Sequence, residues 1–178
     1  MSYQDQYPLL PALQYENEVL LAKFKESYDF SDAEIQMVFL ELKKWLWLRG
    51  CALFEQENGV LGQKIEFMVT KEILILDELW HHFLLFTEEY RRFCETYLGY
   101  VIPHLPNDPS LNQRLSPQEL IERNTKLEQQ FKAQLQFTKE KLGERTLAIW
   151  YKVLAEKYDI QCLAEKHKFT RILKQTPK

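Results

Sequence analysis

The sequence is poor in the residues that mark fibrous, low-complexity or disulfide-rich proteins. It has 5 Gly, 7 Pro and 3 Cys in 178 residues, which excludes collagen-like, disordered and disulfide-framework classes. The CxxC, HExxH, GxSxG and glycine-rich phosphate-loop motifs are all missing, so the common metal, nucleotide and hydrolase signatures are excluded. We therefore assign no catalytic residue, no metal and no cofactor from motifs.

Long apolar runs are also missing. No stretch approaches the roughly 20 residues of a membrane-spanning helix, and the polar start MSYQDQYP has neither a signal-peptide nor a transit-peptide pattern. We expect a soluble, cytoplasmic protein with no membrane partner, whose thiols at Cys51, Cys94 and Cys162 are reduced and mostly buried. A net charge of −3 argues against nucleic-acid binding. The C-terminal half of the chain carries a positive net charge, so nucleic-acid binding stays as a third possible function.

What the sequence does contain is helical periodicity. Hydrophobic residues make up 46% of the chain, enough for the core of one domain, and they recur at spacings of three and four without the alternation of strands. We expect an all-α fold, in which residues 1–178 form a single domain, an irregular bundle of five or six helices around a long central helix. Residues 1–14 are expected to form an irregular N-terminal arm, and residues 160–178 a basic tail.

Local signals place the helix ends. Ser31 with Glu34 has the spacing of a capping box, so a helix should start there and run to about Arg49. Ser116 with Glu119, with proline between them, predicts a second such start. Gly143 indicates a kink or a break in the helix that follows.

The clearest periodicity runs from residue 70 to residue 98. Its apolar stripe is Ile73, Leu76, Trp80, Phe83, Thr87, Tyr90, Cys94 and Tyr97. No proline or glycine interrupts it, so we expect one unbroken rod at the centre of the bundle. Gly99 is a typical helix C-cap, and the prolines that follow predict a long, stiff connection over 99–115.

This segment carries a composite motif. It reads DELWHH, then a tyrosine and a cysteine four residues apart, then a glycine and HLP; the matching positions are Asp77, Glu78, Trp80, His81, Tyr90, Cys94, Gly99, His104 and Pro106. In these residues the chain resembles the glycine-rich domain-containing protein family, in its small bacterial-type form. The resemblance implies a helical domain of unresolved biochemical role.

The candidate binding residues are the polar and aromatic members of that motif: Asp77, Trp80, His81, Tyr90, Cys94 and His104. Asp77 and His81 lie one turn apart, a spacing that chelates a metal or orients the imidazole through the carboxylate. In an unbroken helix His81 is roughly 25 Å from the helix end, whereas six extended residues return at most about 20 Å. We therefore expect His104 to pack near Tyr90 and Cys94, and Asp77 with His81 to be structural.

These observations favour a non-enzymatic helical interaction protein that binds a protein partner or self-associates. This interpretation rests on the aromatic content of 13% and on helices whose narrow apolar stripe leaves them only partly covered by the rest of the fold. The alternative is a metal- or cysteine-dependent enzyme that uses Asp77, His81, Cys94 and His104. That alternative requires a break in the central rod, because only a break brings these residues together.

Overall fold

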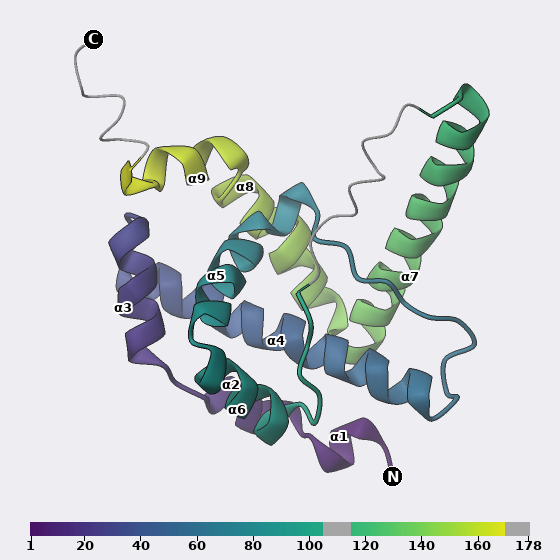
Figure 1. The fold of residues 1–178 in the computed structure, drawn as a ribbon, viewed down its shortest axis with the longest axis horizontal. Helices are drawn as coiled ribbons and strands as arrows, with labels where there is room; N and C mark the ends of the chain where they lie inside the picture. Colours follow the sequence, from purple (N-terminus) through teal and green to yellow (C-terminus); the bar gives the residue numbers. More distant parts are fainter. Residues whose placement is uncertain (105–114, 170–178) are drawn as a thin grey trace.

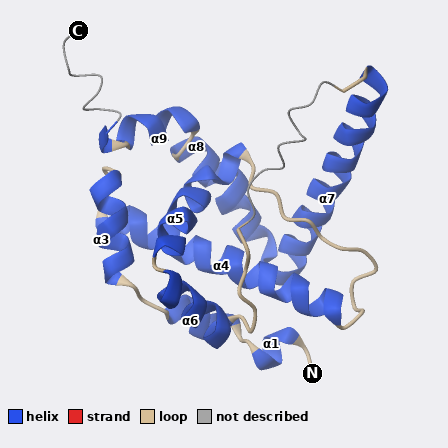
Figure 2. Ribbon diagram, in the orientation of Figure 1, coloured by secondary structure: helices blue, strands red, loops and turns tan. Residues whose placement is uncertain are grey.

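The computed structural model describes residues 1–104 and 115–169 (Figure 1). Helices joined by loops make up this part of the chain, with no strand in either described range (Figure 2). The all-α prediction is confirmed. Within the same residues, no helix combines the length and the apolar character that crossing a membrane requires.

The long central helix is α4, Asp32–Glu57, and not the predicted segment 70–98. It begins as predicted, since the Ser31 hydroxyl accepts from the Glu34 backbone N–H and the Glu34 carboxylate accepts from the Ser31 N–H. The predicted end near Arg49 is wrong, because Gly50 continues the helix instead of ending it. A Cβ there would lie 2.3 Å from the Tyr3 hydroxyl oxygen, so the glycine allows the N-terminal residues to pack closely.

The N-terminal residues are more ordered than predicted. The irregular arm contains two short helices, α1 (Tyr3–Gln6) and α2 (Leu9–Gln14), and α3 (Glu18–Ser27) follows. Tyr3 is buried against α4, where its ring centroid lies 5.4 Å from that of Trp47. Trp47 Nε1 donates to the Tyr7 carbonyl at 2.8 Å. Aromatic packing therefore orders a segment that local propensity alone leaves irregular.

The predicted rod over 70–98 is broken, and this correction matters most for function. A 3₁₀ turn, η1 (Lys71–Ile73), leads into α5 (Leu74–Leu85), and α6 (Thr87–Tyr97) follows after Phe86, whose φ of −92° and ψ of 59° are not helical. Both helices pack on one aromatic cluster: the Tyr15 ring lies 6.1 Å from Phe83 on α5 and 4.9 Å from Phe93 on α6. The break lets both apolar faces reach that cluster.

The rest of the described chain forms a helical hairpin. Helix α7, Pro117–Ala148, starts at the predicted Ser116 capping box, and Gly143 interrupts it with a φ of 81° and a ψ of 167°. The chain turns back through the π-helix η3 (Ile149–Leu154), α8 (Ala155–Lys157) and α9 (Ile160–Lys166). The N-terminal half of α7 projects from the other helices (Figure 1).

Two expectations reach beyond the described residues. The expected tail begins with helix α9, whereas its remainder at 170–178 lies outside the described residues. Most of the expected stiff connection, 105–114 with Pro106, lies outside them as well.

Candidate functional site

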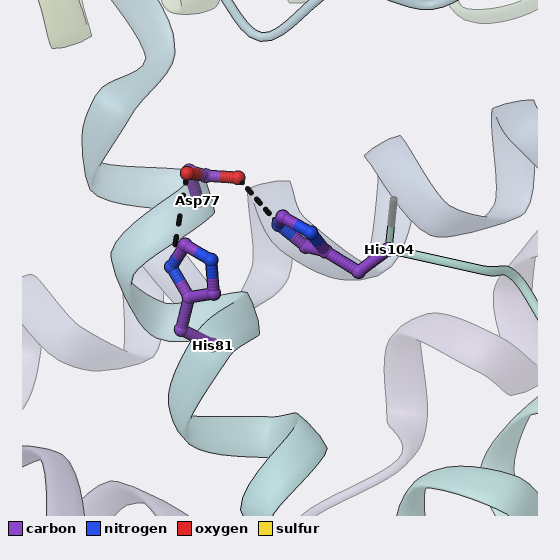
Figure 3. A group of neighbouring side chains, drawn as sticks. All are labelled: Asp77, His81 and His104. Atoms are coloured by element: carbon purple, nitrogen blue, oxygen red, sulfur yellow. Dashed lines mark hydrogen bonds and ion pairs between the residues drawn. The ribbon is translucent and has the colours of Figure 1, made fainter. Parts of the chain in front are cut away.

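Asp77, His81 and His104 form a compact polar group on the face of α5 (Figure 3). The Asp77 carboxylate lies between the two imidazoles: Oδ1 is 2.9 Å from His104 Nε2, and Oδ2 is 3.7 Å from His81 Nδ1. One ligand atom from each residue lies within 4.8 Å of the others. Asp77 and His81 share a face because they are one helical turn apart.

His104 joins them because the chain returns past α5 after α6. Gly99 adopts a φ of +70°, as a C-cap requires, and the backbone then runs back. The Tyr90 hydroxyl donates to the Ile102 carbonyl at 2.6 Å, and the Arg49 guanidinium donates to the Pro103 carbonyl at 3.2 Å. These two bonds hold the residues immediately before His104.

The predicted position of His104 was therefore wrong. Its imidazole bonds Asp77, while Tyr90 and Cys94 contact the backbone of the returning segment. The helix ends at Phe86 instead of continuing to residue 98, so the returning segment has a shorter distance to cover and His104 reaches Asp77.

Aromatic packing fixes the orientation of the His104 ring. Its centroid lies 4.3 Å from the Trp80 ring and 4.4 Å from the His81 ring. Trp80 is itself held by its Nε1, which donates to the Tyr90 hydroxyl at 3.0 Å. The indole also contacts a cation, since the Arg49 guanidinium carbon lies 4.8 Å from its centroid. The site thus has a rigid wall on one side.

On the other side the site is open. The side chains of Asp77 and His104 are each 18% exposed, whereas that of His81 is 49% exposed. A group bound among the three would therefore keep contact with solvent through the His81 side. A ligand in this site would be held against the Trp80 side and would stay accessible to solvent on the His81 side.

The spacing of the three residues fits a divalent metal ion. With bonds of about 2.1 Å and tetrahedral angles, ligand atoms lie roughly 3.4 Å apart. The observed carboxylate–imidazole separations of 2.9 and 3.7 Å, one to each oxygen of Asp77, lie on either side of that value. One ligand atom from each of the three residues lies within 4.8 Å of the others, so side-chain rotations would be needed to bring all three to the spacing of ligands on one ion.

Cys94 and Tyr90 belong to the core. Cys94 is fully buried and Tyr90 is 4% exposed. Burial raises the pKa of both groups, so Cys94 is held as a thiol and lacks the thiolate of a nucleophile. Of the six candidate residues, the structure brings three together as ligand donors, Trp80 supports them, and these two hold the backbone behind them.

Two residues near the site escaped prediction from the sequence. Arg49 comes from α4 and has no sequence signal, since it lies far from the motif along the chain. His82, the neighbour of His81 in the sequence, is partly buried, with Nδ1 2.8 Å from the Glu78 carbonyl and Nε2 3.3 Å from the Ser27 hydroxyl. It faces α3 and does not belong to the polar group.

Comparison with known proteins corrects the family suggested by the motif. The sequence model of the family described as UCP032817-like matches residues 6–133, which include all three residues of the polar group. The resemblance to the glycine-rich domain-containing family, carried by about 30 residues, is overturned by this longer match. No curated protein and no solved structure matches the chain. Because the match spans most of the 178 residues, the chain belongs to the UCP032817-like family.

Proposed function

We propose that the protein binds a divalent transition-metal ion through Asp77, His81 and His104 and uses it in catalysis. The observation that carries the proposal is the convergence of three ligand atoms within 4.8 Å from two separate segments. A structural imidazole–carboxylate pair needs only one histidine. The second histidine, and the exposure of His81, favour a site that takes a ligand.

The donor set indicates which metals fit. Two imidazoles and one carboxylate suit zinc and ferrous iron, whereas calcium and magnesium prefer oxygen ligands alone. Structural zinc sites usually have four protein ligands, but catalytic ones have three and leave a position for water or substrate. With three donors and an open side, this group matches the catalytic pattern. The metal would supply activation of water or polarisation of a substrate oxygen.

The surrounding residues have distinct roles in this proposal. Asp77 would provide the charge that two neutral imidazoles lack, and its helix fixes its spacing from His81. Trp80 would hold the His104 ring in position, as in other metal sites where neighbouring groups orient the ligands. Cys94 has no part, so the cysteine-dependent version of the alternative is not carried forward.

Metal titration tests the proposal. The full chain, made without a histidine tag and stripped with a chelator, is titrated with Zn²⁺ by calorimetry. We expect one saturable zinc site in the wild type, because one ligand atom from each of the three residues lies within 4.8 Å of the others. His81→Ala should weaken binding at least tenfold, and its exposed position should leave folding intact. Asp77→Asn should weaken it further by removing the only charge in the donor set.

The matched control is His82→Asn. It removes the neighbouring histidine on the same helix, while the asparagine amide keeps an N–H donor near the Glu78 carbonyl. Zinc affinity should not change in this variant. Absence of a saturable site in the wild type, or equal affinity in the wild type and His81→Ala, would contradict the proposal.

A second candidate function is binding of a protein partner or of a second copy. The projecting half of α7 supports it, since Leu120 and Leu127 are each 39% exposed and Ile121 is 67% exposed. Sedimentation at micromolar concentration tests self-association. We expect a mass above that of one chain, reduced by Ile121→Glu but not by Val60→Ser, which changes an exposed loop residue. A monomer throughout would leave only a foreign partner, to be sought by pull-down with the same variants.

We also propose that the protein works in the cytoplasm. Its three cysteines are free in the described structure, as is usual in a reducing compartment. Cell fractionation tests this location, and recovery of the protein in a secreted fraction would contradict it.

A further inference from the structure

A cavity of about 310 Å³ lies against the C-terminal half of α4, beside the polar group. One wall is a face of α4, a second is the extended segment that follows this helix, and a third is the residue before His104. Its lining includes Arg49, Leu53, Gln56, Lys64, Phe67 and Pro103. The cavity is large enough for a small organic molecule and is built from three separate parts of the chain.

Arg49 forms no direct ion pair with any carboxylate in the described residues. Its guanidinium donates to the Pro103 carbonyl and lies over the Trp80 ring. Burial lowers the pKa of this guanidinium, although Tyr90 and Asp77 nearby oppose the shift. A charge removed from water without a counterion is unfavourable. An anionic ligand would correct this imbalance.

The other lining residues define the ligand further. Lys64 adds a second cation and is exposed, without an ion pair in the described chain. Glu66 also borders the cavity, and its carboxylate, which accepts a hydrogen bond from Gln130 on α7 at 2.5 Å, offsets one of the two positive charges. Leu53 and Phe67 contribute apolar surface. Two cations and one carboxylate leave one net positive charge beside apolar walls, which suits an oxyanion carried on a small organic body.

We propose that the cavity binds a small organic molecule through a carboxylate or phosphate group held by Arg49 and Lys64. The planar guanidinium matches the geometry of both groups and prefers two parallel hydrogen bonds. Pro103 and Trp80 link the cavity to the polar group, because the first precedes His104 and the second contacts both its ring and Arg49. The inference that this molecule is the substrate of the metal centre rests on the proposed function. Binding of the anion itself is independent of that function.

Binding of two probes to the metal-free full chain tests the inference. Inorganic phosphate and malonate are titrated separately, with chloride held constant. We expect saturable binding of at least one probe, weakened at least tenfold by Arg49→Gln and several-fold by Lys64→Gln. Arg49→Lys keeps the positive charge but loses the planar guanidinium with its two parallel N–H donors, so the loss of probe affinity should be intermediate. Phosphate alone would indicate a phosphate ester, and malonate alone a carboxylic acid.

Controls separate this inference from the metal proposal. Lys152→Gln removes the same charge from an exposed residue of η3 and should leave probe binding unchanged. His81→Ala should weaken zinc binding at least tenfold but keep probe binding. If Arg49→Gln does not fold, Lys64→Gln decides, because Lys64 is exposed. No saturable binding of either probe, or equal binding in the wild type and in the cavity variants, would overturn the inference.

Discussion

Replacement of Tyr90 by phenylalanine tests how the fold holds the site. The Tyr90 hydroxyl is buried and makes two hydrogen bonds, accepting from Trp80 Nε1 at 3.0 Å and donating to the Ile102 carbonyl at 2.6 Å. It therefore connects α5, α6 and the returning segment two residues before His104. Phenylalanine keeps the ring and its packing, so the variant removes these bonds without opening a large cavity.

The expected cost follows from the two groups left behind. An indole N–H and a backbone carbonyl lose their partners in the core, and a buried unsatisfied polar group costs about 1–3 kcal/mol. Allowing for partial relaxation, Tyr90→Phe should lower the free energy of unfolding by about 2–4 kcal/mol. For a chain of this size, each kcal/mol corresponds to about 2–4 °C in melting temperature. Zinc affinity should fall as well, because the residues before His104 lose an anchor.

Equilibrium unfolding in urea measures this change. The slope of the unfolding free energy against urea concentration should be the same in variant and wild type, which shows that the two-state comparison holds. Tyr97→Phe is the matched control, since Tyr97 lies on the same helix and its hydroxyl makes no hydrogen bond in the described residues. A loss below about 0.5 kcal/mol in Tyr90→Phe, or equal losses in both variants, would refute the reasoning.

Three further predictions concern charge, backbone and thiols. Burial alone would raise the pKa of Glu34, but hydrogen bonds from Ser31 and nearby lysines hold it at about 2. Its stabilisation, about 1–2 kcal/mol after allowance for partial exposure, is present above pH 4.5 and lost as pH falls toward 2. Glu34→Gln should therefore flatten the acid limb of a stability–pH curve, and an unchanged limb would count against this. Gly143→Ala should cost about 1–3 kcal/mol in urea unfolding, because its φ of 81° is strained for alanine; Gly62→Ala, in open space, should cost little. Burial raises the pKa of the Cys51 thiol to about 12, so a chromogenic disulfide reagent at pH 8 should label at most one thiol in the native protein and three after denaturation. Labelling of two or more native thiols would show that the core opens.

Local signals predicted much of the fold. The capping boxes at Ser31 and Ser116 and the C-cap at Gly99 occur where the sequence placed them. Each depends on residues within one turn, where a side chain and the nearest backbone groups decide the outcome. The all-α class followed from periodicity in the same way.

The site depended on contacts that local signals do not contain. Phe86 interrupts a regular stripe without proline or glycine, because α5 and α6 pack on the same aromatic cluster. The predicted helix end near Arg49 is wrong because Gly50 lies inside the helix, where the close approach of Tyr3 leaves no room for a side chain. Asp77 and His81 were predicted as a pair from their spacing, whereas His104 required the break to reach them. Which of the candidate residues come together is therefore a tertiary property, which the spacing of residues along one helix does not contain.

X-ray absorption spectroscopy of the zinc-loaded protein tests whether Asp77, His81 and His104 hold the metal. With one equivalent of Zn²⁺, we expect nitrogen and oxygen ligand atoms at about 2.0–2.1 Å from the zinc, with scattering from two imidazole rings. In His81→Ala, scattering from one ring should be lost. Sulfur scattering near 2.3 Å, which indicates cysteine ligands, or the same two-ring spectrum in His81→Ala would contradict the account.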